Sequence, residues 1–324
     1  MRRLAALAAL LVLSGCGRDN GTSPKPAHGP ALLIGFASNR PPSTISGYDQ
    51  YFYDPSSGDP SYLPPNLNTY YDENQGGFSA DGHWYVFTST RVVIDARSTI
   101  YLYDVRAATV HLLSTPGLFA FSQNPTLSGD GHYLAFHYTT GGDLFDQQIA
   151  LMDARADTLI PTPNLHLSGA GEFDPALSGD GKLIAFTSNR NGSLDVFLYS
   201  VPGDSIVPLP GCNTDGYSET GVSISADGRY VAFHSNRPGG VGLFDVYVYD
   251  RQTASLLPMP GANTVLSELN PALSPDGRYV AYETENDGAG DIRLYDLLLQ
   301  RLVPVPGLNS NYFLDRYPTV ANKP

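Results

Sequence analysis

The chain has 324 residues, of which 42% are hydrophobic and 11% aromatic, so it can bury a large core and is neither disordered nor fibrous. Its 33 glycines and 26 prolines suit short strands joined by tight turns better than helices. With 32 acidic and 19 basic residues the formal net charge is −13, which argues against a nucleic-acid partner and against adhesion to anionic lipid through the protein surface.

The N-terminus predicts a secretory signal. Two arginines precede an apolar run over residues 4–13, which is shorter than the roughly 20 residues that span a bilayer. Residues 13–16, Leu-Ser-Gly-Cys, resemble the lipobox of bacterial lipoproteins. The resemblance implies a signal peptide over residues 1–15 and acylation of Cys16 at the new N-terminus. The glycine that follows the cysteine favours the outer membrane, facing the periplasm, in an organism that has one. The alternative is an ordinary secreted protein with an incidental cysteine.

The rest of the chain divides into a tether and one domain. Residues 16–30 are rich in Gly, Pro and polar residues and are expected to form a flexible tether. Residues 31–324 form the folded domain. Besides Cys16 the chain has only Cys212, so the mature chain has no intramolecular disulfide, and we expect Cys212 to be a small apolar filler.

Within this domain a pattern repeats five times. Each copy contains an Asp-Gly pair, at intervals of 49, 50, 47 and 49 residues, and the pairs begin at Asp81, Asp130, Asp180, Asp227 and Asp276. Around each pair lie short segments rich in Val, Ile, Tyr and Phe that alternate with period two, as strands do. We count four strands per copy. Four antiparallel strands repeated at this period predict the blade of a β-propeller, in an all-β fold. The Asp-Gly pairs are expected to be hairpin turns.

The two ends of the domain predict a sixth blade. Residues 32–40, 50–54 and 61–64 match the second, third and fourth strands of a copy, and residues 317–320 match the first. The C-terminal strand should therefore pair with the N-terminal blade and close a six-bladed ring, which removes two exposed sheet edges.

The repeated stretches resemble a known family. Ser-Pro-Asp-Gly-Arg-Tyr-Val-Ala-Tyr at residues 274–282, the Ser-Asn-Arg that follows the second strand in other copies, and Asp-Val-Tyr-Val-Tyr-Asp at residues 245–250 are similar to the WD40-like (PD40) repeats of TolB-type β-propellers. The resemblance covers residues 31–324 and implies the fold. Related repeats occur in periplasmic partner-binding proteins, peptidase accessory domains and some sugar-active proteins, so it leaves the function open. TolB carries an additional N-terminal α/β domain, whereas in this chain we expect only the tether.

Acidic residues recur at one position of the repeat. Aligning the copies places Glu73, Glu172, Glu268 and Asp315 there, with Ser122 and Ser218 in the other two blades and Glu219 one residue further on. Loops that enter the first strand and leave the second should share one face, so these acids are expected to surround the channel mouth. They could hold a cation or a basic group of a partner. Alternatively, each pairs with an arginine on the same face, Arg40, Arg91, Arg190 or Arg237.

Aromatic side chains accompany these acids in the same loops. Together they form the expected partner-binding face, which comprises Tyr70, Tyr71, Glu73, Phe121, Glu172, Phe173, Tyr217, Glu219, Glu268, Tyr312, Phe313 and Asp315. Exposed aromatic residues mixed with acids suit a protein or glycan partner better than a small buried substrate. The alternative is that some of the rings fill gaps between blades.

Metal binding is a weaker hypothesis. His137, His234 and Glu283 occupy one repeat position, and two imidazoles with a carboxylate suit a transition metal by type. The alternative is a packing position, since other copies have Thr or Ala there. Glycine turns rich in oxygen ligands at residues 189–195 and 286–291 leave a bound Ca²⁺ or another divalent cation open, although neither has EF-hand spacing. No other cofactor is expected.

The motifs favour a binding protein over an enzyme. The chain has no Gly-x-Ser-x-Gly elbow, no His-Glu-x-x-His and no P-loop. We therefore expect a monomeric, lipid-anchored, non-catalytic scaffold of the cell envelope for a protein, peptide or glycan. The alternatives are a metal-dependent lyase or hydrolase acting on acidic sugars, with His137 and His234 as ligands, and a passive structural protein. Convergence of the two histidines near the channel would favour the enzyme.

Overall fold

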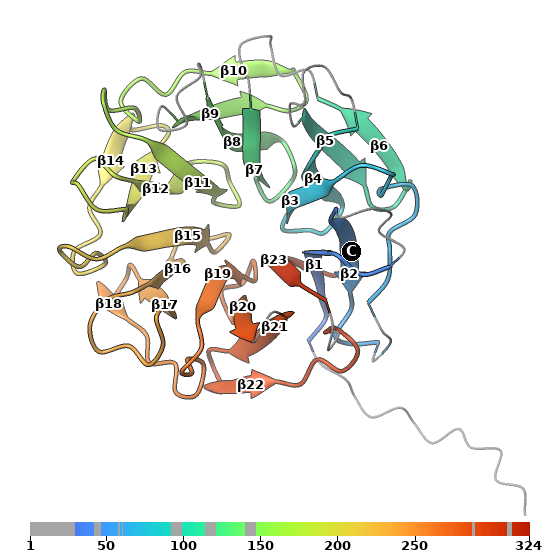
Figure 1. Ribbon diagram of the computed structural model, residues 1–324. Helices are drawn as coiled ribbons and strands as arrows, with labels where there is room; N and C mark the ends of the chain where they lie inside the picture. The colour runs from blue at the N-terminus through green and yellow to red at the C-terminus, as the bar shows by residue number, and fades with distance from the viewer. Residues whose placement is uncertain are drawn as a thin grey trace, which may run out of the picture.

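Six antiparallel sheets stand around a common axis in a computed structural model of the protein (Figure 1). This confirms the predicted all-β, six-bladed propeller. Over the described residues no helix is long and apolar enough to cross a membrane. The described residues are 30–41, 47–57, 59, 61–91, 99–113, 121–139, 147–286, 289–309 and 313–324. The predicted signal peptide and Cys16 lie outside them.

Each blade consists of strands that pair in order from the channel outward. Blade 1 contains β23 (Asp315–Asn322), β1 (Leu32–Ser38) and β2 (Asp49–Tyr53). Blade 2 contains β3 (Glu73–Phe78), β4 (Trp84–Ser89), β5 (Thr99–Asp104) and β6 (Thr109–Leu112). Blade 3 contains β7 (Phe121–Leu127), β8 (Tyr133–Thr139), β9 (Gln147–Asp153) and β10 (Thr158–Ile160). Blade 4 contains β11 (Glu172–Leu177), β12 (Leu183–Ser188), β13 (Asp195–Ser200) and β14 (Ser205–Val207). Blade 5 contains β15 (Glu219–Ile224), β16 (Tyr230–Ser235), β17 (Asp245–Asp250) and β18 (Ser255–Leu256). Blade 6 contains β19 (Glu268–Leu273), β20 (Tyr279–Asn286), β21 (Ala289–Asp296) and β22 (Arg301–Val303).

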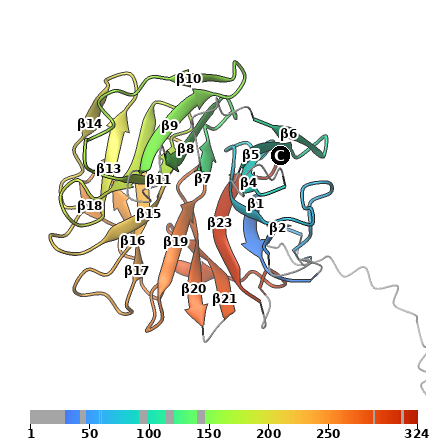
Figure 2. The same cartoon turned by 45° about the horizontal axis from the view of Figure 1, so that its top comes forward.

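The ring closes as predicted, through the C-terminal strand. β23 pairs antiparallel with β1, with Leu32 opposite Asn322 and Ser38 opposite Asp315. In both views β23 lies between β1 and β19 (Figures 1 and 2). The predicted fourth strand of blade 1 is reduced to a single bridge, in which the backbones of Phe52 and Tyr62 exchange two hydrogen bonds of 2.9 Å.

The hydrophobic core lies between the blades. Each of the six interfaces between neighbouring blades contains one cluster of buried side chains. The two sheets that face each other both contribute to it. Between blades 1 and 2, for example, the ring of Phe52 lies 4.8 Å from that of Phe78 and 5.0 Å from that of Tyr85, centroid to centroid. Cys212 is fully buried between blades 4 and 5, which is the filler role expected for it.

The Asp-Gly pairs form the turns between first and second strands. In the turn of blade 5, Gly228 has φ of +71°, and the Asp227 carboxylate accepts hydrogen bonds from the Ser225 hydroxyl at 2.6 Å and from the Arg229 N–H at 2.9 Å. A side chain at the glycine would strain this backbone, so the structural interpretation of the pairs is confirmed. We call the end of the ring with these turns the turn face. The opposite end, where the innermost strands begin, is the loop face.

Candidate functional site

The predicted acids begin the innermost strands, at the loop face, but they do not line an open mouth. All five acidic residues in this set are buried: Glu73, Glu172, Glu219, Glu268 and Asp315. The alignment of Ser218 with this set is wrong. Glu219 pairs with Ser235 as Glu172 pairs with Ser188, so Glu219 holds the position in blade 5, and Ser122 holds it in blade 3.

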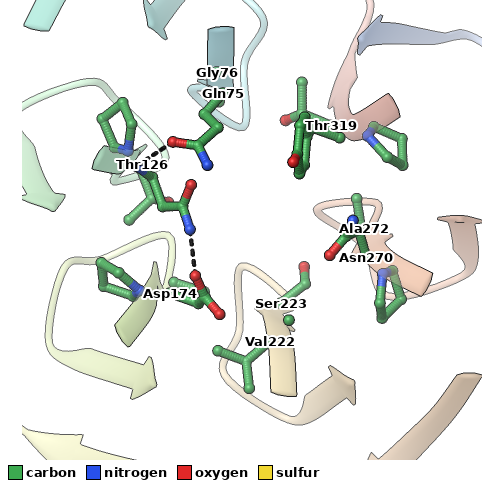
Figure 3. A pocket seen from close by; sticks show the side chains of 18 residues that line it. Gln75, Gly76, Thr126, Asp174, Val222, Ser223, Asn270, Ala272 and Thr319 are labelled. Carbon is green, nitrogen blue, oxygen red and sulfur yellow. Dashed lines mark hydrogen bonds between the residues drawn. The ribbon is translucent and has the colours of Figure 1, made fainter. Parts of the chain in front are cut away.

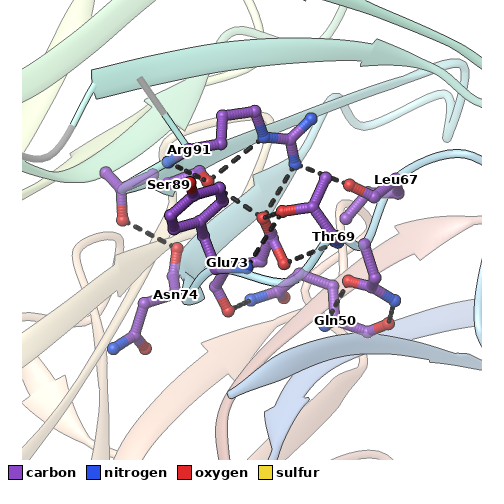
Figure 4. Close-up of polar contacts among 10 residues, drawn as sticks. Gln50, Leu67, Thr69, Glu73, Asn74, Ser89 and Arg91 are labelled. Carbon is purple, nitrogen blue, oxygen red and sulfur yellow. Dashed lines mark hydrogen bonds and ion pairs between the residues drawn. The ribbon is translucent and has the colours of Figure 1, made fainter. Parts of the chain in front are cut away.

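Local donors satisfy each carboxylate. Figure 4 shows the arrangement in blade 2, where Glu73 accepts hydrogen bonds from the Thr69 hydroxyl at 2.6 Å, the Thr69 N–H at 3.0 Å and the Ser89 hydroxyl at 2.9 Å. The Arg91 guanidinium completes the cluster at 3.0 Å and also donates to the carbonyl of Leu67 at 2.6 Å. The acid therefore ties the preceding loop to the end of the second strand.

Arginines hold four of the five acids. Arg40, Arg91, Arg190 and Arg237 bind Asp315, Glu73, Glu172 and Glu219 respectively, at 2.5–3.2 Å. Each guanidinium also lies over two aromatic rings, as Arg190 lies 5.0 Å from the ring centroid of Phe186 and 4.7 Å from that of Phe197. Glu268 is held by Thr264 instead, and burial raises its pKa. The ion pairs with arginine, which the sequence left as the alternative, are thus found for four of the five acids. These carboxylates have few acceptor sites left for a ligand.

A ring of bulges lies just inside the loop face. In every innermost strand the register with its neighbour shifts at a β-bulge. One residue of each bulge has φ between 38° and 64°, and these six residues are Gln75, Asn124, Asp174, Gly221, Asn270 and Tyr317. Four of the six are Gly, Asn or Asp, which adopt this left-handed conformation most readily. This ring of bulges was not predicted from the sequence.

The bulges surround the mouth of the central channel. Together with the two residues that follow each bulge, they line a cavity of about 360 Å³ (Figure 3). Its polar lining side chains are three amides, of Gln75, Asn124 and Asn270, the carboxylate of Asp174, and hydroxyl groups. Asn124 donates its amide to the Asp174 carboxylate and its N–H to the Gln75 side-chain oxygen at 3.2 Å. Such a lining can hydrogen-bond polar groups of a ligand, such as peptide bonds.

The channel narrows toward the turn face. There the residues before the Asp-Gly pairs join neighbouring blades through backbone hydrogen bonds, in which Gly129 donates to Gly179 and Gly179 to Ala226, each at 2.8 Å. The cavity at this level is about 90 Å³. A Cβ at Gly179 would lie 2.9 Å from the Cβ of Ala226, so only small residues fit. Access to the channel is therefore wider from the loop face.

The three candidate metal ligands do not come together. They lie at three blade interfaces, where each accepts a hydrogen bond from the bulge N–H of the next blade: Asp174 to Nδ1 of His137 at 3.2 Å, Asn270 to Nδ1 of His234 at 3.2 Å, and Tyr317 to Oε1 of Glu283 at 2.5 Å. Burial lowers the pKa of both histidines, to about 4 for His234, so the rings are neutral acceptors. Burial raises the pKa of Glu283 to about 7. Among the described residues no three His, Cys, Asp or Glu side chains form a metal-binding group. The separation of His137 and His234 removes the observation that would have favoured the enzyme.

Exposed apolar side chains gather on the loop face. Of the predicted face, Tyr70, Tyr71 and Tyr217 are exposed, by 63%, 43% and 37%. Phe173 and Phe313 are half-buried, while Tyr312 and the side chain of Phe121 lie outside the described parts. Four aliphatic residues that were not predicted from the sequence also lie in loops at this end of the ring. These are Leu167, Val241, Leu243 and Val265, exposed by 50%, 59%, 78% and 83%. We call these seven exposed residues of blades 2, 4, 5 and 6 the apolar crown.

Comparison with known proteins supports the fold. The sequence matches no protein-family model and no curated protein. Among solved structures, TolB from Acinetobacter baumannii is similar with a TM-score of 0.68 and 22% identity, over 89% of this chain and 66% of that one. A protein of Agrobacterium tumefaciens assigned as a TolB has a TM-score of 0.61 and 14% identity, over 91% of this chain and 99% of that one.

Peptidases also contain a similar propeller. A puromycin-hydrolysing peptidase from Mycobacterium tuberculosis has a TM-score of 0.53 and 16% identity, over 85% of this chain and 45% of that one. This chain thus spans less than half of the peptidase. At these identities the likeness is one of fold, the six-bladed propeller that TolB also has.

Proposed function

We propose that this chain is a non-catalytic binding protein of the bacterial cell envelope, which docks a protein partner on its loop face. The apolar crown is the observation that carries the proposal. Its seven side chains come from loops of blades 2, 4, 5 and 6 at the loop face, whereas on the turn face the exposed large apolar residues in the described ranges are Leu298 and Leu299. Exposed apolar groups gathered on one face are typical of protein docking sites.

The channel supports a partner that also inserts a segment of chain. Its polar cavity of about 360 Å³ lies toward the loop face and narrows toward the other face. A peptide strand presents alternating donors and acceptors, which the side chains of Gln75, Asn124 and Asn270 can pair with. Docking of a folded domain with one extended segment in the channel fits both surfaces better than docking of a small substrate.

Catalysis has less support. The buried acids are engaged in ion pairs or hydrogen bonds, and the two candidate histidines are separate acceptors between blades. The peptidases that share the fold are more than twice as long as the part that this chain matches. No specific contact among the described residues favours a hydrolase or lyase.

Cys16 supports the location in the envelope. The lipobox-like residues 13–16 imply a lipid anchor there, and the polar residues that follow would serve as the tether. The outer membrane facing the periplasm is the proposed site, in agreement with the TolB proteins among the structural neighbours. The short outermost strands, such as the two-residue β18, limit pairing between sheet edges and favour a monomer.

Site-specific photo-crosslinking tests the proposal. A photoreactive residue at Leu243 on the loop face should give one discrete protein adduct in envelope extracts. The same residue at Leu298, which is similarly exposed but lies on the turn face, is the matched control and should give none. Equal adducts from both positions, or none from Leu243, would contradict a docking site on the loop face.

A further inference from the structure

Among the described residues, one carboxylate on the loop face lacks the partners that its counterparts in blades 4 and 5 have. Asp49 begins β2, its side chain is 5% exposed, and in the described chain no hydrogen bond or ion pair reaches its carboxylate. The same position in blade 4 is Asp195, which accepts from Asn191 at 3.2 Å and Ser193 at 3.1 Å. In blade 5 it is Asp245, which accepts two backbone N–H groups of its own loop. The counterpart in blade 6, Asp291, also has no donor from the described residues within reach of its carboxylate but is only half-buried, whereas Asp49 is buried. A buried carboxylate without a partner is costly, so Asp49 needs an explanation.

Asp49 lines a cavity between blades 1 and 2. The cavity has a volume of about 420 Å³, and its apolar walls are Leu63, Pro64, Pro65 and Tyr70. Its other polar side chains are already engaged. Asn68 exchanges two hydrogen bonds of 2.8 Å with the backbone of Gln50, and the Thr69 hydroxyl, shown in Figure 4, donates to Glu73. The carboxylate of Asp49 is thus the free acceptor in a pocket that is otherwise apolar or satisfied.

The electrostatics of the cavity favour the binding of a positively charged group. Burial, with the nearby charges of Glu73 and Asp72, raises the pKa of Asp49 to about 6. Glu73 already has Arg91 as its counter-ion, whereas Asp49 has none among the described residues. A cation that enters the cavity would therefore compensate the negative charge of the Asp49 carboxylate. The ring of Tyr70, 63% exposed beside Tyr71, stands at the rim and offers an aromatic face that attracts cations.

We propose that this cavity receives the ammonium or guanidinium group of a lysine or arginine side chain from the partner that docks on the loop face. This inference rests on the proposed function and adds the charge that the partner presents. The apolar walls suit the methylene stem of such a side chain, while its charged end reaches the carboxylate. Tyr70 belongs to both the apolar crown and the cavity rim, so one docked surface would cover both.

NMR titration with short capped peptides tests the inference without the natural partner. The peptide Gly-Gly-Lys-Gly-Gly should cause saturable shifts of backbone amide signals around Gln50 and Tyr70. The same peptide with norleucine in place of lysine keeps the stem without the charge and should cause none. Asp49→Asn should weaken lysine-peptide binding about tenfold or more, because it removes the charge at constant size. Tyr70→Leu should weaken it by a smaller factor.

Asp195→Asn is the matched control, since this aspartate is bonded within its own loop. It should leave lysine-peptide binding unchanged. Asp49→Asn should also unfold at a higher denaturant concentration than the wild type, which shows that the variant is folded. Equal shifts with the norleucine peptide, or undiminished binding to Asp49→Asn, would overturn the inference. Partner docking at Leu243 without lysine-peptide binding would refute this inference alone, and lysine-peptide binding without partner docking would refute only the proposed function.

Discussion

Removal of Arg190 tests whether the ring of acids is structural. The guanidinium binds Glu172 at 3.2 Å and the carbonyl of Leu165 at 2.8 Å, and the side chains of Arg190 and Glu172 are 9% and 1% exposed. Arg190→Met keeps much of the packing between Phe186 and Phe197 but leaves a buried carboxylate without its arginine, with His166 at 3.4 Å as its remaining basic neighbour. Loss of one member of a buried ion pair costs about 3–5 kcal/mol, and we expect a decrease of that size in the free energy of unfolding.

Urea denaturation at pH 7, followed by near-ultraviolet circular dichroism, measures this change. Adding Glu172→Gln to Arg190→Met removes both charges and should restore most of the lost stability, to within about 1–2 kcal/mol of the wild type. Arg155→Met is the control, because Arg155 and Asp130 form an exposed pair at 3.7 Å, worth about 0–1 kcal/mol. If Arg190→Met costs no more than Arg155→Met, or if the double variant is as unstable as the single one, the structural assignment of the acids fails.

Three further predictions concern pH, ring closure and the anchor. Burial raises the pKa of Glu283 from 4.5 to about 7, so the folded protein holds this proton more tightly than the unfolded chain. Protonated Glu283 therefore adds up to about 3 kcal/mol to the free energy of unfolding. This contribution is complete below pH 4.5 and is lost as the pH rises through 7. Denaturation midpoints from pH 5 to 8 should therefore fall more steeply for the wild type than for Glu283→Gln, and equal slopes would refute this. Deleting residues 317–324 removes most of β23 and should abolish cooperative unfolding of the ring, whereas deleting Pro324 alone should leave the thermal midpoint nearly unchanged. Cys16→Ser should move the protein from the membrane to the soluble fraction without changing its thermal midpoint, and recovery mainly in membranes would contradict the anchor.

The fold was predictable because its determinants are local and repeated. The Asp-Gly turns recur at nearly constant spacing, and the strand-like residues 32–40 and 317–320 each match part of one copy, which was enough to predict closure by β23. Blade 1 departs from four full strands, since a single bridge between Phe52 and Tyr62 stands in place of its fourth strand. A repeat pattern predicts where strands lie in a typical copy, but it does not predict a departure that occurs in a single blade.

The site was harder to predict because it depends on burial and register. The position of Glu73 in the repeat was clear, but its complete burial results from the loop that contains Leu67 and Thr69, which folds over it. The bulge ring results from a register shift between two strands, although the Asn and Asp residues at 124, 174 and 270 were a usable signal for left-handed backbone. Asp49 carries no such signal. Aspartates occupy its position in other blades too, and the missing donors are evident only from the surrounding contacts.

The affinity of the crosslinked partner for two matched variants tests the central claim most directly. Val265→Asp places a charge in the apolar crown, and Leu298→Asp places one on the turn face, at side chains that are 83% and 73% exposed. Calorimetric titration should show binding weakened about tenfold or more for Val265→Asp, since a charge is buried when the crown docks, and unchanged for Leu298→Asp. Unchanged binding to Val265→Asp, or weakened binding to Leu298→Asp alone, would contradict docking on the loop face.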